Sequence, residues 1–473
     1  MQDALVLYLP ALIVFAAVAW TGTIMVDGDT YLHVAAGQWI IQHGQFLHHD
    51  PFTYTYQGAP WTDPEWLSEV VMAIAFRAAG WSGVARIFAA SASLTAVLLT
   101  RRLLKHLEPL AAAIVAQLAL ACVAQSLSSR PYLFALPLLV AWADGLLAAR
   151  HENRAPRVWL LLLMTLWTNL HGSFLFGIAL IGPFAAEAFF AERTNKLRVL
   201  REWTLFAAGS VVAALINPSG FDGFIAPAVF SVRPVLAHVV DWQSSVFPEV
   251  GPLEIAILSL IAVALYRPVR VPIFRLLLVL LLLHMTLAHR RHIYLFAVLT
   301  PMLLAEPIAL ALSGRTDASG IARSLSTSRV ANACAAAVAL AVILARLAVP
   351  DVRVNDRASP LKALAQVPPT VARLPVLNED VLGGFLIWHG IRPFIDTREE
   401  LYDDAFLSNY VAIITPWPNA VVSTLARYHI GWTFLAPRNG ANVVLDSLAD
   451  WRVVYADRYV VIHVRTSAVQ QPR

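Results

Sequence analysis

Long apolar runs separated by short polar loops fill the first 350 residues of the chain. Because a helix needs about 20 mainly apolar residues to cross roughly 30 Å of hydrocarbon, about eleven of these runs are candidate membrane spans. They cover residues 4–25, 82–104, 109–127, 131–149, 157–169, 173–191, 202–217, 251–266, 271–288, 293–312 and 330–349. The first run lacks a basic n-region and a cleavage site, which indicates a retained helix. The pattern predicts a polytopic α-helical membrane protein with about 11 transmembrane helices.

Two segments are too long to be simple connectors. In the first exported loop, residues 26–81, the stretches 29–44 and 65–80 repeat apolar residues at helical spacing but are too polar to span, which predicts interfacial helices. The tail carries more charge and has shorter apolar runs, and its predicted strands are 392–396, 432–437, 452–456 and 458–464. We therefore expect a transmembrane domain at 1–349 and a small C-terminal α/β domain at 350–473.

The composition excludes several classes of protein. Of the 473 residues, 58% are apolar and 14% are charged, whereas a soluble chain has about 25% charged residues. The net charge is +4, and the basic residues lie mostly in short loops rather than on one face, so no nucleic-acid partner is expected. Cys122 and Cys334 lie far apart inside apolar runs, which favours neither a disulfide nor a thiolate metal site.

Lys and Arg are distributed unequally between alternate loops. A cytoplasmic N-terminus places sixteen of them in cytoplasmic loops of the membrane part and six on the opposite side. With an odd number of spans, this orientation exports everything after residue 350. The sequence therefore predicts a multi-pass protein whose terminal domain lies outside the cytoplasm.

An acidic pair, Asp27 and Asp29, stands where the first span reaches the exported side. Two carboxylates this close at a membrane boundary repel each other, which raises a pKa unless a cation or hydrogen-bond donors compensate. If a helix begins near Gly28, Asp29 and His33 share one face, where a carboxylate can orient an imidazole or both can bind one metal ion. The alternative is that Asp29 caps the helix and Asp27 is solvated.

Further polar residues gather at the expected exported ends of the spans. Arg130, Arg290 and Arg291 run against the positive-inside trend, and guanidinium groups bind phosphate through paired hydrogen bonds. The alternative explanation for these arginines is that they snorkel to lipid head groups. For Asn169 and His171 the alternative explanation is interhelical hydrogen bonding. Other candidates are His292 near the last of these arginines, and Asp50, Asp63, Glu65 and Glu69 in the first loop.

Two features of the tail favour a structural interpretation. Gly383 and Gly384 follow no clear strand and lack the spacing of a phosphate-binding loop, so we expect a turn there. Asp396 and Arg398 are two residues apart and favour a structural ion pair over a ligand contact.

The chain resembles the GT-C superfamily of membrane glycosyltransferases, and in particular a large group of bacterial membrane proteins described as glycosyltransferase-like. The resemblance covers nearly the whole chain and is carried by GDTYLHVAAGQWIIQHGQFLHHDPFTYTYQGAPWTDPEWLSE, SSRPYLF, LWTNLHGSFLFG, INPSG, HRRHIYLF and GGFLIWHGIRPFIDTREELY. It implies a GT-C-like architecture, a bacterial inner membrane location, and a C-terminal domain in the periplasm or outside the cell.

The resemblance also implies roles for the candidate residues. Asp27 or Asp29 would accept the proton of the acceptor or hold a cation as the sugar leaves its phosphate. The donor would be a polyprenyl-phosphate sugar, its phosphate held by Arg290 and Arg291 with Arg130. Mg²⁺ or Mn²⁺ is a possible cofactor, with Asp27, Asp29 and His33 as its ligands.

The expected function is therefore transfer of a sugar from a polyprenyl-phosphate donor, within the membrane, to an unknown glycan, lipid or protein acceptor on the exported side. Two other classes remain open. A transporter or flippase of a lipid-linked solute would place charged or broken helices near mid-membrane, whereas these polar clusters gather at one face. A non-catalytic scaffold in envelope polysaccharide assembly would tolerate loss of the acidic pair.

Overall fold

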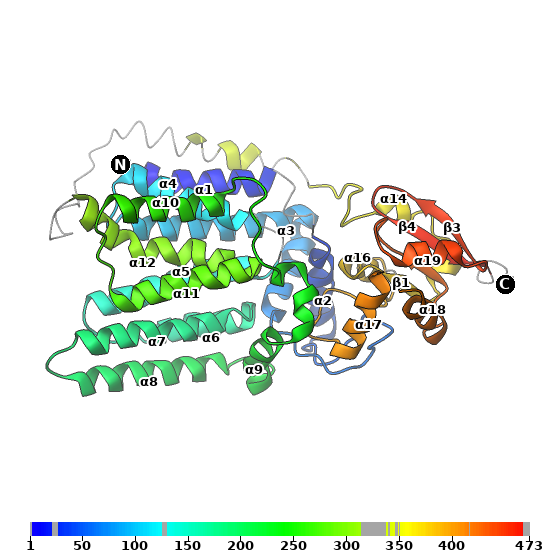
Figure 1. Ribbon diagram of the computed structural model, residues 1–473, viewed down its shortest axis with the longest axis horizontal. Coiled ribbons are helices and arrows are strands. Elements are labelled where there is room, and N and C mark those ends of the chain that lie inside the picture. The colour runs from blue at the N-terminus through cyan, green and yellow to red at the C-terminus, as the bar shows by residue number, and fades with distance from the viewer. Residues whose placement is uncertain are drawn as a thin grey trace.

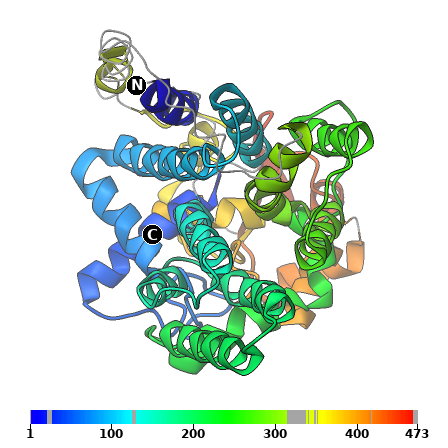
Figure 2. The ribbon, with the colours of Figure 1, turned by 90° about the vertical axis from the view of Figure 1, so that its left-hand side faces the viewer.

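The computed structural model describes residues 2–20, 27–124, 130–313, 337–338, 341–345, 349, 351–415 and 417–466. It is mostly helical: a bundle of apolar helices stands at one side, and a smaller part built around a sheet stands at the other (Figure 1). The bundle helices run side by side, as the view along their axes shows (Figure 2). They are α1 (Gln2–Trp20), α3 (Trp66–Leu103), α4 (Pro109–Ala124), α5 (Tyr132–His151), α6 (Leu160–Leu170), α7 (Phe174–Ala191), α8 (Lys196–Ala214), α10 (Pro252–Tyr266), α11 (Ile273–Ala288) and α12 (Ile293–Ser313).

Four helical segments of the described residues are long and apolar enough to cross a membrane. They are α3, α5, α7 and Arg290–Leu312. Shorter apolar helices overlap five more of the predicted spans, while the predicted span 202–217 overlaps α8, whose first turns are charged. The predicted span 330–349 lies largely outside the described residues. The helical membrane architecture is therefore confirmed, and the number of about eleven spans is not.

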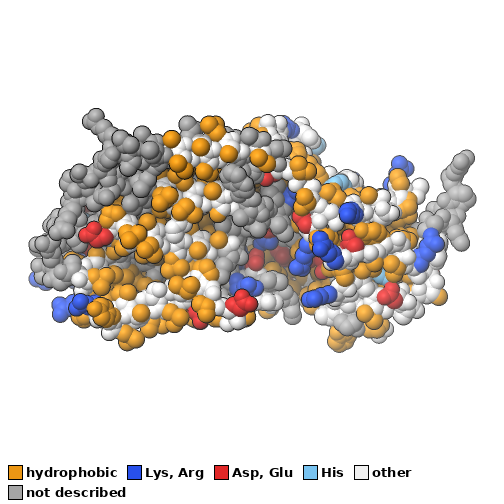
Figure 3. Space-filling view, turned by 90° about the horizontal axis from the view of Figure 1, so that it is seen from above, with side chains coloured by type: hydrophobic (Ala, Val, Ile, Leu, Met, Phe, Trp, Pro, Cys, Tyr) orange, Lys and Arg blue, Asp and Glu red, His pale blue; other side chains and the backbone are white. Residues whose placement is uncertain are grey.

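The helix ends gather into two opposite ends of the bundle. The junction end, next to the sheet-containing part, carries Arg130, His171 and η4 (Arg290–His292). The far end carries Arg150 at the close of α5 and Arg275 at the start of α11. In a space-filling view the flank of the bundle is largely hydrophobic, and Lys and Arg gather at the far end and around the junction (Figure 3). The loops predicted to share a side of the membrane thus share an end of the bundle.

The two helices predicted in the first loop are present. They are α2 (Asp29–His43) and the first half of α3, which a kink at Ala79 and Gly80 separates from the second half. Gly80 has φ 59°, a left-handed conformation that favours glycine. The two helices cross closely because Gly37 has no side chain: a Cβ there would lie 2.0 Å from the Glu69 carbonyl oxygen.

The tail folds around a four-stranded sheet of order β1-β2-β4-β3. Its strands are β1 (Val376–Asn378), β2 (Trp432–Phe434), β3 (Trp451–Ala456) and β4 (Val461–Arg465). β1 pairs parallel to β2, with Leu377 opposite Thr433, and the remaining pairs are antiparallel. The helices of this part are α14 (Leu361–Leu364), α15 (Pro369–Ala372), α16 (Gly383–Trp388), α17 (Asp404–Ile414), α18 (Pro418–Arg427) and α19 (Ala441–Ser447).

Two predictions for the tail are wrong. Residues 392–396 form no strand, because the Asn378 side chain replaces a strand ladder: its Oδ1 accepts from the Phe394 N–H at 2.8 Å and its Nδ2 donates to the Ile395 carbonyl at 2.8 Å. Gly383 and Gly384 do not form a turn but begin α16. A Cβ on Gly384 would lie 2.6 Å from the carbonyl oxygen of Gly28, so glycine is required for close packing.

The first loop and the tail share hydrophobic cores. One cluster joins Ile40, Leu47 and Trp61 of the loop to Phe394 and Tyr402 of the tail. A second packs Tyr31 of α2 among tail residues such as Phe385, with the two rings 5.5 Å apart and nearly perpendicular. α2 is therefore largely covered by protein, and the tail is held against the junction end of the bundle. The division at 349/350 stays a prediction.

Candidate functional site

The acidic pair lies where α2 begins, at the junction between bundle and tail. Gly28 brings this turn against the tail, since a Cβ there would lie 1.9 Å from the carbonyl oxygen of Val381. The backbone N–H of Asp29 donates to Asp27 Oδ1 at 3.0 Å. Asp29 is the first residue of α2 and Gly28 holds the capping position, so the capping alternative for Asp29 is wrong. Its carboxylate instead contacts residues distant in sequence.

One guanidinium group gathers three carboxylates at this point. Arg130 precedes α5 and extends its Nε to Asp27 Oδ2 at 2.6 Å and its Nη2 to Asp29 Oδ2 at 3.0 Å. Its Nη1 lies 2.6 Å from Asp241 Oδ2, in the 3₁₀ helix η3 (Val240–Trp242). Charge-assisted contacts of this length are strong, and they hold Arg130 and the acidic pair in one geometry. The sequence analysis missed Asp241, because nothing in a single acidic residue of a long loop marks it as the partner of Arg130.

Burial and charge act in opposite directions on Asp29. Removal from water raises its pKa to about 6 and is the larger effect, while Arg130 lowers the pKa and Asp27 raises it. Asp29 therefore changes protonation state close to neutral pH. A carboxyl group of this kind can accept a proton from a reacting hydroxyl or amide and release it again.

A second group of carboxylates lies beside the first. His33, one turn along α2 from Asp29, places Nδ1 3.0 Å from Glu69 Oε1 and Nε2 3.9 Å from Glu65 Oε2. Asp63 accepts a hydrogen bond from the Glu65 backbone N–H at 2.9 Å. Burial is the largest effect on Glu65 and raises its pKa to about 7; His33 lowers this pKa and Asp63 raises it. Burial also raises the pKa of Asp63 well above its usual range. The site thus contains more buried carboxyl groups than cations, so some are protonated at neutral pH.

His171, between α6 and α7, completes this group. The Ser173 backbone N–H donates to its Nδ1 at 3.0 Å, which leaves the proton of the neutral ring on Nε2, 3.2 Å from Glu65 Oε1. Burial lowers the pKa of His171 to about 3, and the nearby charge of Arg291 lowers it further, so the ring is neutral. His171 can therefore donate a hydrogen bond to Glu65 and fix its position.

The arginines before α12 lie on the other side of His171. The Arg291 guanidinium carbon stacks 4.2 Å from the centroid of the Trp242 ring, next to Asp241, and Arg291 is half-buried. The Arg290 side chain is exposed, while its backbone N–H donates to the Gln243 carbonyl at 3.0 Å. His292 is buried, with its ring near that of Trp242. The arginines therefore border the same cluster as the carboxylates, since Asp241 and Trp242 are adjacent.

Two candidates have structural contacts instead. Asn169 accepts from Trp66 Nε1 at 2.8 Å and donates to the carbonyls of Thr165 and Ile216, which is the interhelical bonding given as its alternative. Asp50 is buried and accepts from Arg398 Nη2 at 2.8 Å. Both belong to the framework around the site.

Arg398 also binds Asp396, as the structural interpretation predicts, with Nη2 to Oδ2 at 2.6 Å. It stacks 4.5 Å from the centroid of Trp61. Because Trp61 and Asp50 belong to the first loop, the ion pair connects the loop to the tail. Trp61 Nε1 in turn donates to Glu400 Oε1 at 3.1 Å.

The predicted metal ligands do not form a ready coordination set. Arg130 already contacts an oxygen of Asp27 and one of Asp29, and the ring of His33 contacts Glu65 and Glu69. Among the residues that the structure describes, no group of three or more His, Cys, Asp or Glu side chains is arranged to hold a metal ion. The metal site stays a prediction.

The fold is shared with membrane glycosyltransferases of the GT-C class. An archaeal oligosaccharyltransferase, AglB from Archaeoglobus fulgidus in complex with an inhibitory peptide and a dolichol-phosphate, superposes with a TM-score of 0.55 at 14% identity, covering 91% of this chain and 69% of that chain. The apo form of the Archaeoglobus fulgidus oligosaccharyltransferase gives a TM-score of 0.54 at 14% identity, covering 90% and 69%. No family profile and no curated protein sequence matches the chain. The likeness confirms the GT-C fold expected from the sequence.

Proposed function

We propose that the chain transfers a sugar from a polyprenyl-phosphate donor to an acceptor at the junction end of the bundle. The observation that carries the proposal is the convergence of the acidic pair with Arg130 and of His171 with Arg291 in one cluster. The GT-C fold supports it, because a structure with that fold binds a dolichol-phosphate and a peptide. In this account the junction end faces the exported side of a bacterial inner membrane, with the N-terminus in the cytoplasm.

The proposed chemistry needs one base. The acceptor oxygen or nitrogen attacks the anomeric carbon, its proton passes to Asp29, and the bond from that carbon to the donor phosphate oxygen breaks. Asp29 suits this role because its pKa of about 6 leaves it ionised at neutral pH yet able to hold a proton. Asp27 shares Arg130 with Asp29, which fixes both carboxylates.

The leaving phosphate needs positive charge. Arg291 is the proposed main contact, since its half-buried guanidinium stacks on Trp242 at the border of the cluster. Arg290, being exposed, would attract the phosphate from the membrane surface. Arg130 is committed to three carboxylates, so we assign it to positioning the acidic pair rather than to the phosphate. His292 packs behind Trp242, and Glu65 and His33 line the acceptor side.

The test uses proteoliposomes containing the full chain and a panel of polyprenyl-phosphate sugars labelled in the sugar. With a membrane extract supplying the acceptor, transfer appears as release of polyprenyl phosphate together with label attached to another molecule. The proposal predicts turnover of at least one donor by the wild type and none by Asp29→Asn. Asp222→Asn, which neutralises an exposed acid on α9 (Gly220–Ser231), is the matched control and should turn over normally.

Two outcomes would contradict the proposal. If Asp29→Asn, folded and at wild-type abundance, forms product at the wild-type rate, Asp29 is not the base. If the wild type moves an intact donor across the bilayer without releasing polyprenyl phosphate, the chain is a transporter of lipid-linked solutes.

A further inference from the structure

A second network of charged side chains lies at the far end of the bundle, away from the candidate site. Arg275 of α11 binds Glu187 of α7 through two hydrogen bonds, Nε to Oε2 at 2.9 Å and Nη2 to Oε1 at 3.0 Å. Arg150 of α5 places Nε 3.1 Å from Glu187 Oε1, and Glu306 of α12 lies 3.6 Å from Arg275 Nη1. Charged side chains therefore join four helices here, α5 and α7 with α11 and α12.

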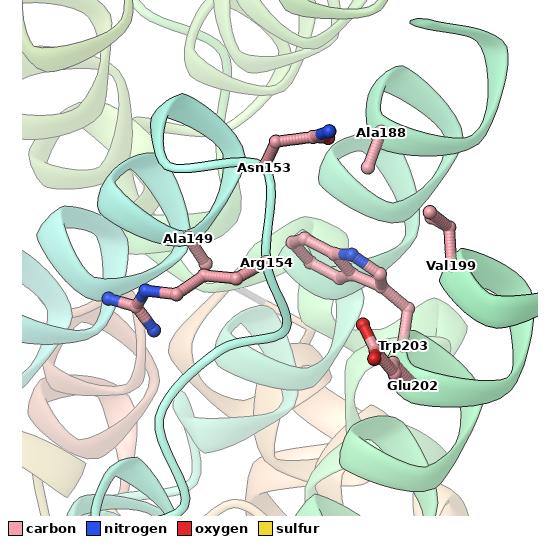
Figure 4. A pocket seen from close by; sticks show the side chains of 7 residues that line it. All are labelled: Ala149, Asn153, Arg154, Ala188, Val199, Glu202 and Trp203. Atoms are coloured by element: carbon pink, nitrogen blue, oxygen red, sulfur yellow. The ribbon is translucent and has the colours of Figure 1, made fainter. Parts of the chain in front are cut away.

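A cavity of about 300 Å³ opens beside this network. It is lined by Arg150, His151, Glu187, Arg270, Pro272, Arg275, Glu306, Pro307 and Leu310. The lining thus combines charged side chains with an apolar part made of two prolines and a leucine. A neighbouring pocket between α5, α7 and α8 offers no such room, because the buried side chain of Trp203 fills it (Figure 4).

The charges that line the cavity do not cancel. Three arginines face two glutamates, and His151 can add to the excess when protonated. Arg270 is exposed and makes no ion pair within the part of the chain that the structure describes, whereas Arg150 and Arg275 share Glu187. Among the described residues that line the cavity, the arginines therefore exceed the glutamates by one positive charge.

An apolar surface leads away from the cavity along α11. Ile273 follows the lining residue Pro272 and is 58% exposed, and Leu277 and Leu280 further along the helix are 54% and 51% exposed. Side chains of this kind on a membrane helix contact lipid chains. A molecule with an anionic head in the cavity can therefore lay a hydrocarbon chain along α11.

We propose that this cavity binds the phosphate group of an anionic membrane lipid in the leaflet at the far end of the bundle. Basic pockets between transmembrane helices are suited to anionic head groups, and guanidinium groups bind phosphate with paired hydrogen bonds. Arg270 supplies the charge that the lipid neutralises, and Arg275 is held in place by Glu187. The bound lipid joins α5, α7, α11 and α12 at the end opposite the candidate site.

The experiment measures lipid binding to the purified full chain in neutral detergent by native mass spectrometry. The probes are dioleoylphosphatidylglycerol, dioleoylphosphatidylcholine with the same chains, and inorganic phosphate. The wild type should bind the phosphatidylglycerol more tightly than the phosphatidylcholine. Arg270→Gln should weaken phosphatidylglycerol binding about fivefold, the effect of one basic residue near an anionic lipid surface.

Two further variants separate the cavity from general surface charge. Arg267→Gln removes an exposed arginine from the same loop, outside the cavity, and should leave the affinity within about twofold of the wild type. Glu306→Gln removes a negative charge from the lining and should strengthen binding. Equal losses in Arg270→Gln and Arg267→Gln would overturn the proposal. So would inorganic phosphate that binds as tightly as phosphatidylglycerol, since the lipid would then add nothing.

Discussion

The two ends of the helical bundle bury charged side chains in different proportions. At the far end Glu187 accepts two hydrogen bonds from Arg275 and lies against Arg150. At the junction end one guanidinium, Arg130, serves three carboxylates, while Glu65 and Glu69 share His33. Both arrangements cost desolvation. At the far end one buried carboxylate has two guanidinium partners, whereas at the junction end three carboxylates share one guanidinium.

The difference supports the proposal that the reaction takes place at the junction end. The ion pair between Arg275 and Glu187 holds two helices together at the far end. An excess of buried carboxyl groups is unfavourable for folding, and it is retained where perturbed pKa values serve a reaction. Asp29 and Glu65, with pKa values raised by burial to about 6 and about 7, fit that description.

The largest expected effect comes from removing Arg130, the cation that contacts the acidic pair. Arg130→Gln deprives Asp29 of the charge that lowers its pKa, so Asp29 should be protonated at pH 7 and unable to act as a base. Transfer should fall about 100-fold at pH 7. Raising the pH to 9 should recover part of the activity, and Arg130→Lys should be intermediate.

A pH profile of donor turnover in the proteoliposome assay checks this. A purely structural role for Arg130 predicts equal loss at every pH, with no recovery in alkali. That result would contradict the proposal that Asp29 acts as the base.

The corresponding change at the far end should affect stability instead. Glu187→Gln leaves Arg275 buried without its main partner, and breaking a buried pair in this way costs roughly 3 kcal/mol of unfolding free energy. Activity per folded molecule should not change. Denaturant unfolding in detergent measures the loss, with the exposed Glu249→Gln as the matched control. A Glu187→Gln variant that is fully stable but inactive would contradict the assignment of a stabilising role to the far end.

Activity and stability should depend on pH in opposite directions. Asp29 and Glu65 have pKa values of about 6 and about 7 in the folded chain, whereas the ordinary values are 3.8 and 4.5. At a pH between the ordinary and the raised pKa of each group, the folded chain therefore binds more protons than the unfolded chain. Their contribution to stability is therefore fully present below about pH 4 and is lost as the pH rises through 6 and 7. Transfer should instead rise over the same interval, as the base becomes ionised.

Thermal unfolding and donor turnover between pH 5 and 8 provide both curves. In Asp29→Asn the part of the stability slope that lies between about pH 4 and about pH 6 should disappear. Parallel rises of stability and activity with pH would show that the raised carboxyl pKa values are absent.

The smallest effects are expected at the two arginines before α12. Arg291→Gln should raise the KM for the donor about tenfold, since it removes a charged hydrogen-bond donor to phosphate. Arg290→Gln, at an exposed position, should raise KM no more than about fivefold. Steady-state kinetics with the active donor distinguishes them. A larger effect at Arg290 than at Arg291 would place the phosphate outside the cluster.

The sequence predicts the fold well where one physical rule dominates. Apolar runs of membrane length mark α5, α7 and α12, and helical periodicity marks α2 and the first half of α3. Prediction from the sequence fails where one side chain takes the place of regular secondary structure. The Asn378 side chain makes hydrogen bonds to the backbone at 394–395, so this extended apolar segment joins no sheet. Gly383 and Gly384 have the composition of a turn, but close packing against α2 requires them.

The candidate site is predictable only in part, for a related reason. Asp27, Asp29 and Arg130 are marked by the cost of placing charge at a membrane boundary, and the structure brings them together. No feature of the sequence distinguishes Asp241. Asn169 and Asp50 are candidate site residues in the sequence, but in the structure their side chains make hydrogen bonds that stabilise the surrounding framework. Pairings between residues more than one hundred positions apart depend on helix packing, which spacing along the chain does not encode.

The most direct test of the account is a cryo-electron microscopy map of the full chain in nanodiscs with saturating polyprenyl phosphate. We expect phosphate density within hydrogen-bonding distance of Arg291 at the junction end, with the lipid chain entering from the bilayer. Phosphate density found only in the cavity beside Arg270 and Arg275, with none at the junction end, would contradict the assignment of the donor site.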